Sequence, residues 1–400
     1  KHLEKFNILT PLQHGFRKGH SCVTQLLQVV NDWMEGIDNC DQIDAAILDF
    51  TKAFDCVPHE RLKSKLHYYG IRNNTLNWIS MFLSQRKQRV VLNGATSNWH
   101  NVISGVPQGT VLGPLLFLLY INDIVDDLHC DIRLFADDCI IYRTIKNNDD
   151  STQLQEGLNH VCRWADKWQM TFNPKKCNTM TIGLKKNNIC TDYTMMGETL
   201  AQVNEHKYLG ITISDNMTWD ASYRNMVNKA NRILGLLQRN VHNCSQSTKA
   251  KAYKALVRPH LEYAAAVIDP HQTNHIQMLD RVQRRAARFV VNDFRRTSSV
   301  TKMLNDLQWE PLSDRRQTAR LCQFYQIHHG TSPVTSSKLQ ARNAKFSSRR
   351  YTVDAYKQIE TRTVRFQNSF FPRTIVDWNK LPLKITSLSS LEEFKAALNI

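Results

Sequence analysis

The amino-acid sequence predicts an α+β protein whose first part mixes strands with helices and whose remainder is helical. Up to about Ser214, short apolar and β-branched runs alternate with amphipathic helical stretches. From Trp219 onward, apolar residues recur only at helical spacing. With 400 residues, 42% of them hydrophobic, the chain is long enough for two or three compact units with their own cores. We therefore expect three regions, at residues 1–215, 216–335 and 336–400.

The elements of the first region follow from the spacing of apolar residues and from turn residues. Apolar residues at helical spacing predict a helix over 20–36, and the run DAAILDF predicts a strand over 44–50. Asn93-Gly94 favours a tight turn in a hairpin over 89–102. The other elements expected are a helix from Pro58 to Gly70, the loop SGVPQGT (104–110) with a helix over 115–121, a helix over 154–168, and short strands at NTMTIG (178–183) and KYLGITIS (207–214).

Two adjacent acidic residues interrupt the apolar stretch IRLFADDCIIYR (132–143). The flanking runs predict two short strands, with Asp137 and Asp138 at the turn between them. Two unit charges about 4 Å apart repel by about 4 kcal/mol at an effective dielectric near 20, so a bound cation would stabilise such a pair. A solvent-exposed acidic turn is the alternative, and the dipeptide by itself does not decide between them.

A second acidic position in the sequence favours a bound cation over a solvent-exposed acidic turn. In LDFTKAFD (48–55), Asp49 ends an apolar strand and Asp55 follows six residues later. If that strand pairs with the acidic hairpin in one sheet, two or three carboxylates meet, and carboxylate oxygens are ligands that Mg²⁺ prefers. Paired Mg²⁺ ions about 3.5–4 Å apart promote in-line phosphoryl displacement.

The net charge of +16 is concentrated in one segment. Residues 221–350 hold 23 Lys and Arg against 7 Asp and Glu, whereas residues 1–220 hold 22 against 24. Such an asymmetry favours a polyanion-binding face attached to a part that performs chemistry. A row of arginines opposite an apolar helix face is commonly only a solvated surface, but a row within this basic segment favours contact with a nucleic-acid backbone. The row consists of Arg281, Arg284, Arg285 and Arg288.

Other features narrow the class of protein. The ten cysteines show no C-x-x-C pair or zinc-knuckle spacing, which predicts reduced thiols in a nuclear or cytoplasmic protein. The longest apolar run, VLGPLLFLLYI (111–121), is too short to span a membrane and is interrupted by Gly113 and Pro114. The chain begins at Lys1 without a leader, so we expect a piece of a longer polypeptide.

Several motifs, taken in order, resemble those of reverse transcriptases. LDFTKAFD, SGVPQGTVLGPLLFLLYIND (104–123) and FADD (135–138) resemble the palm motifs of that family. LTPLQHGFRKGHSC (9–22), TFNPKKCNTM (171–180) and KYLGITIS resemble its non-LTR, LINE-type branch, especially jockey-like retrotransposons. The resemblance is specific over residues about 7–215 and looser beyond. It implies a right-hand polymerase fold: partial fingers and a palm with an antiparallel sheet in 1–215, a basic helical thumb in 216–335, and a linker with a small helical appendix in 336–400.

The resemblance also implies roles for individual residues. Asp49 and Asp137 would bind two Mg²⁺ ions, for which Mn²⁺ is a possible substitute, and Asp138 would complete the acidic cluster. Phe50 would offer its backbone carbonyl to a metal. Phe54 would exclude a ribose 2′-hydroxyl, with an ordinary core phenylalanine as the alternative. Further implied positions are Gln108 and Gly109 at the nucleotide and template, Lys176 or its rival Lys175 near the departing pyrophosphate, Arg17 and Lys18 near the triphosphate or template, and Tyr208, Leu209 and Gly210 in a primer grip or, alternatively, an edge strand.

The function that the resemblance implies is RNA-directed DNA polymerisation, in which a primer 3′-hydroxyl attacks the α-phosphate of a dNTP. The partners would be an RNA template, a DNA primer or RNA–DNA hybrid, and dNTPs, without a membrane. We expect an N-terminally truncated copy, lacking fingers sequence upstream of QHGFR and the endonuclease domain of its parent polyprotein. The alternatives are an inactive remnant that only binds nucleic acid and, third, an intron-encoded maturase or telomerase-like enzyme.

Overall fold

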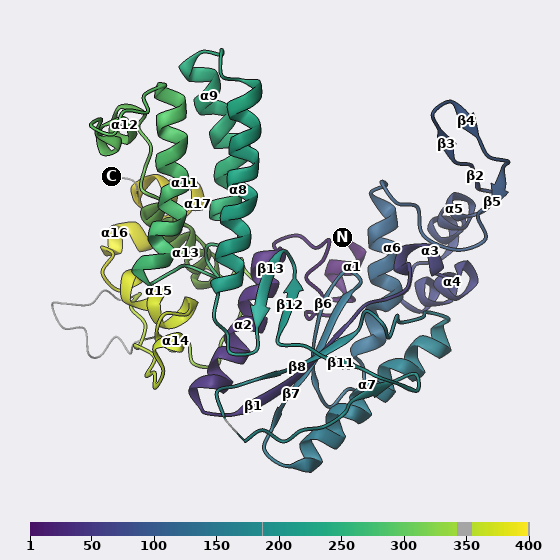
Figure 1. Ribbon diagram of the computed structural model, residues 1–400. Helices are drawn as coiled ribbons and strands as arrows, with labels where there is room; N and C mark the ends of the chain where they lie inside the picture. Colours follow the sequence, from purple (N-terminus) through teal and green to yellow (C-terminus); the bar gives the residue numbers. More distant parts are fainter. Residues whose placement is uncertain (186, 342–353, 399–400) are drawn as a thin grey trace. The chain divides into compact units, whose positions relative to one another are not determined.

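The computed structural model describes residues 1–185, 187–341 and 354–398 and divides into two compact units (Figure 1). The first unit comprises residues 1–25 and 40–204, and the second comprises 26–39 and 205–400. Helix α2 (Cys22–Asp38) therefore begins in the first unit and continues in the second, a division that sequence order does not suggest. The mixture of helices and sheet confirms the predicted α+β class. The Ser/Arg-rich part of the predicted linker lies outside the described residues.

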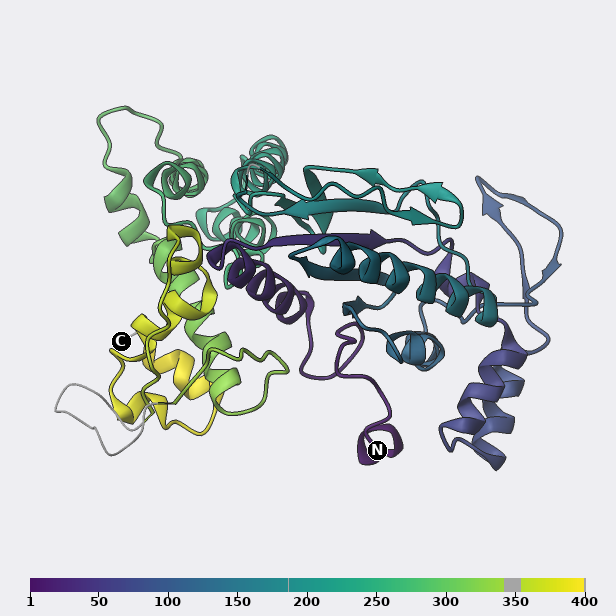
Figure 2. The same ribbon diagram turned by 90° about the horizontal axis from the view of Figure 1, so that it is seen from below.

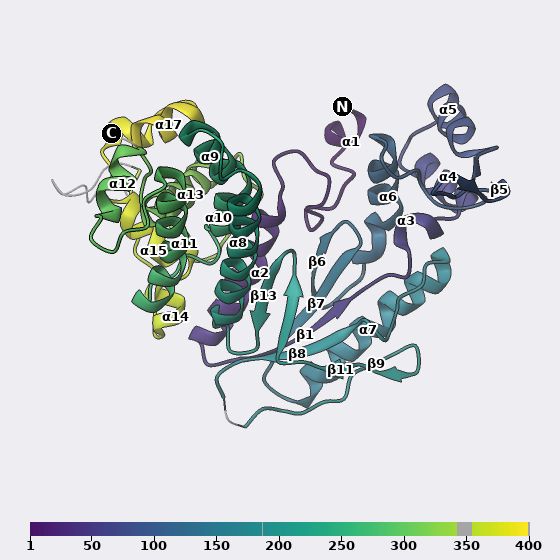
Figure 3. The ribbon, with the colours of Figure 1, turned by 45° about the horizontal axis from the view of Figure 1, so that its top comes forward.

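A five-stranded sheet forms the centre of the first unit, in the order β11-β8-β1-β7-β6 (Figure 3). The central strand β1 is buried along its whole length, which explains its continuous apolar sequence. All neighbouring strands run antiparallel except β11 and β8. The predicted strand over 44–50 begins and ends two residues earlier than expected. The strands are β1 (Gln42–Leu48), β6 (Asp131–Phe135), β7 (Asp138–Ile145), β8 (Asn178–Ile182) and β11 (Ala201–Gln202).

Helix α7 (Asn148–Trp168) runs along one face of this sheet (Figure 2). It begins with a capping box in which Asn147 and Asp150 satisfy each other's backbone N–H groups, and its apolar stripe is buried in the core. Helix α6 (Leu112–Ile121) is apolar all round and almost entirely buried, as its position in the core requires. The other helices of this unit are α1 (His2–Lys5), α3 (Ala53–Cys56), α4 (His59–Tyr68), α5 (Asn73–Leu83) and the 3₁₀ helix η1 (Asn122–Val125).

A long exposed hairpin lies between α5 and α6. The predicted turn is confirmed, because Asn93 and Gly94 both adopt positive φ, at 48° and 85°. The strands of this hairpin are β2 (Lys87–Gln88), β3 (Val91–Leu92), β4 (Ala95–Thr96) and β5 (His100–Asn101), and a smaller hairpin consists of β9 (Thr194–Met195) and β10 (Glu198–Thr199).

The later segment of the second unit, from Glu205, begins with a hairpin where one strand was predicted. KYLGITIS is broken at Leu209 and Gly210, whose φ angles of 43° and 86° reverse the chain between β12 and β13. Helices follow, and α8 and α11 lie side by side around a common core (Figure 1). The apolar stripe predicted on α11 is buried, with Leu279, Val282 and Ala286 at 0–1% exposure.

The remaining elements of the second unit are β12 (Glu205–Tyr208), β13 (Ile211–Ser214), α8 (Asp220–Asn240), α9 (Gln246–Ala252), the π-helical turn η2 (Tyr253–Val257), α10 (Arg258–Glu262), α11 (Thr273–Val291), α12 (Val300–Asp306), α13 (Leu312–His328), α14 (Val364–Gln367), α15 (Phe370–Trp378), α16 (Leu383–Thr386) and α17 (Leu391–Leu398). The last four of these helices lie within residues 336–400, for which a linker and a helical appendix stay a prediction, and Phe394 stacks on Tyr325 of α13. Across the described residues, no helix combines the length and the apolar character needed to cross a membrane.

Candidate active site

Strand register brings Asp49 beside the acidic hairpin. Strands β1 and β7 pair as far as Leu48 opposite Cys139, so the next position, Asp49, falls at the level of Asp138. The two-residue turn of the hairpin is Ala136-Asp137, because Phe135 pairs with Asp138. Asp138 therefore begins β7, where the sequence analysis had placed it within the turn.

The three carboxylates interact electrostatically. The pKa of Asp138 is raised to about 6, first by desolvation and then by the negative charges of Asp137 and Asp49. The pKa of Asp137 is also raised, mainly by desolvation, and the charge of Asp49 adds to the rise. Both shifts mean that the ionised form of these carboxyl groups is disfavoured where they stand, and a bound cation would stabilise that form.

Asp49 is fixed through its backbone and has one unsatisfied oxygen. Its carbonyl accepts the N–H of Asn173 at 2.8 Å, which joins the end of β1 to the segment before β8. Its Oδ2 is buried and accepts no hydrogen bond, although Lys176 Nζ lies 3.4 Å away as an ion-pair partner. Of the two candidate lysines, Lys176 rather than Lys175 is thus the one paired with this carboxylate.

The carboxylates suit a cation whose remaining ligands come from a substrate, and they do not enclose a cation by themselves. Among the residues that the structure describes, no group of three or more His, Cys, Asp or Glu side chains is arranged to hold a metal ion. The expectation that Asp49 and Asp137 bind the metal ions, with Asp138 completing the cluster, stays a prediction. Mg²⁺ is commonly held by one or two carboxylates together with substrate phosphates. The Oδ2 of Asp49, which accepts no hydrogen bond, and the acidic Asp137–Asp138 turn fit that arrangement.

The two phenylalanines of the first motif differ in their surroundings. Phe50 is buried and its ring stacks on Phe172 at 4.1 Å, so its side chain belongs to the core. Phe54 is only half-buried; its ring stacks on Phe117 at 4.3 Å and lies edge-on to Phe16. One face of the Phe54 ring therefore packs on Phe117, and the side chain is not fully enclosed as that of an ordinary core residue would be.

The loop that carries Gln108 is fastened to the segment that carries Phe54. Val106 N–H donates to Phe54 O at 2.8 Å, and Gln108 Nε2 donates to Asp55 Oδ1 at 3.1 Å. A Cβ at Gly105 would lie 2.7 Å from Asp55 O, so glycine is needed for this approach. Gly109 has a φ of 73° and open space around it, so its backbone conformation favours glycine.

Gln13 supports the acidic turn, a role that was not predicted from the sequence. Gln13 is buried, and its Oε1 accepts the N–H groups of Ala136 at 2.8 Å and Gly15 at 2.7 Å. A Cβ at Gly15 would lie only 2.3 Å from Ala136 N, so the turn rests directly on this glycine. Gln13 lies in the block QHGFR, which belongs to a motif that resembles the reverse transcriptase family. Nothing in this block by itself indicates a contact more than a hundred residues away. Arg17 of the same block hydrogen-bonds to Thr10 O and Gln13 O and lines a cavity of about 590 Å³, as does Lys18.

The predicted primer grip and arginine row belong to the second unit. Tyr208 is buried, and Tyr263 donates a hydrogen bond to the carbonyl of Leu209, which supports the β12–β13 turn. Arg281, Arg284 and Arg285 are exposed on α11. Arg288 differs, because its guanidinium donates to the carbonyls of residues 293, 295 and 298 and so holds the loop after α11.

Comparison with known proteins defines the class of this chain. The profile of the family described as reverse transcriptase (RNA-dependent DNA polymerase) matches residues 1–213, and the chain belongs to that family. The resemblance expected from the motifs is thereby confirmed.

Two curated relatives are RNA-directed DNA polymerases from mobile elements of Drosophila melanogaster, one of them named as probable. The probable RNA-directed DNA polymerase from transposon X-element is 30% identical over 308 residues, covering 72% of this chain and 32% of the relative. The RNA-directed DNA polymerase from mobile element jockey is 28% identical over 320 residues, covering 76% and 34%. The chain thus spans about a third of the length of these relatives. A telomerase structure from Candida albicans shows a TM-score of 0.38 at 11% identity, covering 80% of this chain and 53% of that one, a likeness too low to support an argument.

Proposed function

We propose that this chain is an RNA-directed DNA polymerase that transfers a nucleotidyl group from a dNTP to a primer 3′-hydroxyl on an RNA template. The observation that carries the proposal is the register that sets Asp49 beside the Asp137–Asp138 turn. In a chain of the reverse transcriptase family, charged carboxylates at the end of central strands suit binding of a metal–triphosphate complex.

Divalent cations would be held by Asp49, Asp137 and the backbone carbonyl of Phe50, with Asp138 adding negative charge. Two Mg²⁺ ions, or Mn²⁺ in their place, would when bound activate the primer hydroxyl and stabilise charge on the phosphates. The protein itself supplies positioning and electrostatics. Lys176, held at 3.4 Å from Asp49, is suited to stabilise or protonate the departing pyrophosphate.

The nucleotide would be positioned by residues fastened to one another in the first unit. Phe54, supported by Phe117, would meet the sugar and reject a 2′-hydroxyl, and Gln108 would contact the base pair being formed. Gly109 lets the backbone adopt positive φ beside it. Arg17 and Lys18 would contact the triphosphate or template from the fingers.

The second unit would bind the template–primer duplex as a thumb. Exposed Arg281, Arg284 and Arg285 would contact phosphates, whereas Arg288 serves the fold of its loop. The turn at Tyr208, Leu209 and Gly210 would form the primer grip. We keep the proposed division into fingers and palm (1–215), thumb (216–335) and appendix (336–400). Binding should weaken as the salt concentration rises. Each phosphate that the protein neutralises should add about 0.9 log unit to the fall in affinity for every tenfold rise in salt.

Primer extension tests the proposal. The purified chain is given poly(rA)/oligo(dT), dTTP and Mg²⁺, and incorporation is measured beside duplex binding at low and high salt. Asp137→Asn removes one charge at nearly constant shape and should lower incorporation at least about 100-fold. Asp127→Asn, at an exposed position, is the matched control and should be close to the unsubstituted chain.

Two results would overturn the proposal. Normal incorporation by Asp137→Asn would remove the acidic turn from the mechanism. Salt-sensitive duplex binding by the unsubstituted chain without any incorporation would instead identify a protein that only binds nucleic acid.

A further inference from the structure

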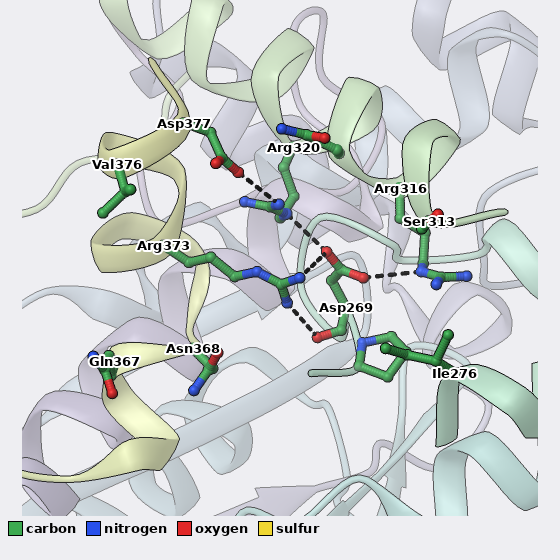
Figure 4. A pocket seen from close by; sticks show the side chains of 12 residues that line it. Asp269, Ile276, Ser313, Arg316, Arg320, Gln367, Asn368, Arg373, Val376 and Asp377 are labelled. Carbon is green, nitrogen blue, oxygen red and sulfur yellow. Dashed lines mark hydrogen bonds and ion pairs between the residues drawn. The ribbon is translucent and has the colours of Figure 1, made fainter. Parts of the chain in front are cut away.

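A buried carboxylate in the second unit is surrounded by three guanidinium groups (Figure 4). Asp269 pairs with Arg316 of α13 at 2.9 Å, with Arg320 of the same helix at 2.9 Å and with Arg373 of α15 at 3.2 Å. Arg316 and Arg320 are only 2–3% exposed. Burying a charged group is expensive unless partners satisfy it, so the balance of charge and hydrogen bonds here is informative.

Arg320 and Arg373 are accounted for by their contacts. Arg320 also pairs with Asp377 at 3.0 Å and hydrogen-bonds to Thr374, so it fastens α13 to α15. Arg373 donates a second hydrogen bond, to the carbonyl of Asp269 at 3.0 Å. These contacts give the two residues a structural role, and Arg373, which is partly exposed, keeps further N–H groups for a ligand.

Arg316 is not fully satisfied. Its Nε donates to Asp269 at 2.9 Å, but its Nη1 is buried and has no hydrogen-bond partner. A charged donor left unsatisfied in the interior destabilises the fold by about 1–3 kcal/mol or more. The charge of Asp280 also acts on Arg316, yet the orphaned nitrogen remains without an acceptor.

Arg316 and Arg373 line the same cavity, of about 490 Å³. Ser313 and Gln317 of α13 and Asn368, next to α14, add polar groups to its wall, and Pro270, Ile276 and Val376 add apolar surface. Three arginines against Asp269 and Asp377 leave an excess of positive charge on the lining. The pKa of Arg373 is lowered mainly by burial; the charges of Asp269 and Asp377 raise it, and those of Arg320 and Arg316 lower it.

We propose that this cavity is a phosphate-binding site, in which the Nη1 of Arg316 and the guanidinium of Arg373 donate to one phosphate group. Guanidinium groups match phosphate geometry and form strong charge-assisted hydrogen bonds with it. The cavity is larger than a phosphate ion needs, so the group can belong to a free phosphate or mononucleotide or to the end of an RNA strand. This site is separate in sequence from the carboxylate cluster and does not depend on polymerase activity.

Titration calorimetry on the full chain tests the site. Inorganic phosphate, AMP, and a short RNA with either a 5′-phosphate or a 5′-hydroxyl are titrated in EDTA at fixed ionic strength, with chloride as the blank. EDTA removes the divalent ions through which the carboxylate cluster would hold phosphates. We expect saturable binding of phosphate, and Arg373→Gln, at a partly exposed position, should raise its Kd at least about tenfold. Arg296→Gln makes the same charge change at an exposed position and should leave the Kd within about twofold.

Two further variants control for misfolding and for phosphate binding at the carboxylate cluster. If circular dichroism shows that Arg373→Gln is unfolded, Gln317→Leu replaces it, with an expected rise in Kd of about threefold. Asp137→Asn should bind phosphate as the unsubstituted chain does, whatever its polymerase activity. Preference for AMP assigns the site to free nucleotides, and a preference for 5′-phosphorylated over 5′-hydroxyl RNA assigns it to strand ends. Absence of saturable binding in every arm, or equal weakening by Arg296→Gln and Arg373→Gln, overturns the site.

Discussion

The side-chain amide of Gln13 hydrogen-bonds to both the backbone N–H and the backbone carbonyl of Ala136. Its Oε1 accepts the Ala136 N–H at 2.8 Å, and its Nε2 donates to the Ala136 carbonyl at 3.3 Å. Ala136 has a φ of 54°, a left-handed conformation that costs a non-glycine residue about 1–2 kcal/mol. Gln13 therefore stabilises a strained residue directly before Asp137, so the position of that carboxylate depends on a residue more than a hundred positions earlier in the chain.

Replacing Gln13 should destabilise the first unit. Gln13→Ala leaves the buried N–H groups of Ala136 and Gly15 without an acceptor, at about 1–3 kcal/mol each, so we expect a loss of about 2–6 kcal/mol in the free energy of unfolding. Urea unfolding followed by circular dichroism measures it. Gln88→Ala, in the exposed hairpin, should change stability by less than about 0.5 kcal/mol. Equal losses in the two variants would show that the Gln13 hydrogen bonds do not support the turn.

The sequence predicted those features that local periodicity encodes. The helices predicted over 20–36 and 154–168 correspond to α2 (Cys22–Asp38) and α7, which begins earlier, at Asn148. The strand predicted over 44–50 corresponds to β1. These elements could be predicted because apolar residues recur regularly along each of them. The Asn93-Gly94 turn was predicted because its residues suit positive φ.

Features that depend on tertiary contacts could not be predicted in this way. Leu209 adopts positive φ although leucine rarely does, and the supporting contact comes from Tyr263, distant in the chain. The choice between Lys175 and Lys176 depends on which side chain faces Asp49, and adjacent residues in a loop have no periodicity to decide it. The orphaned Nη1 of Arg316 likewise follows only from three-dimensional packing.

Acid should destabilise the chain through His14. Burial, then the positive charges of His20, Arg133 and Arg17, lower the pKa of His14 to about 3, and its Nδ1 lies 3.0 Å from Thr24 Oγ1. Because the folded-state pKa is below the unfolded value of 6.5, the unfolded chain binds the extra proton between these values. The stabilisation is present above about pH 6.5 and is lost as the pH falls toward 3, by about 3–5 kcal/mol in total.

The difference between two variants isolates this effect from the titration of carboxylates. His14→Gln keeps a group that can hydrogen-bond to Thr24 but has no proton to bind, so the unsubstituted chain should lose more stability than this variant between pH 6.5 and 4. Urea unfolding at a series of pH values measures the difference. His100→Gln, at an exposed position, should follow the unsubstituted chain. Parallel pH profiles for His14→Gln and the unsubstituted chain would contradict the assignment.

Lys176 should matter to nucleotide incorporation and Lys175 should not. Of these two lysines, Lys176 is the one that pairs with Asp49, at 3.4 Å, and in the proposed mechanism its ammonium group faces the departing pyrophosphate. Lys176→Ala should lower the single-turnover rate of incorporation about 100-fold, in the range of general acid catalysis, whereas Lys175→Ala should lower it less than about twofold. Rapid-quench measurement with saturating dNTP gives both rates. A similar loss in the two variants would indicate a general effect of positive charge on binding instead.

Phe54 should determine the choice between deoxyribonucleotides and ribonucleotides. Its ring is half-buried and stacked on Phe117 at 4.3 Å, so truncation opens space without removing a fully enclosed core residue. Phe54→Ala should raise the kcat/KM for rUTP relative to dTTP at least about tenfold, since a removed steric clash of 1.4 kcal/mol has that effect. Leu66→Ala, in the buried core of α4, should lower stability by about 2–5 kcal/mol and leave the ratio unchanged. If Phe54→Ala lowers stability in the same way but leaves the ratio unchanged, the ring serves only packing, and selection against the 2′-hydroxyl must lie elsewhere in the first unit.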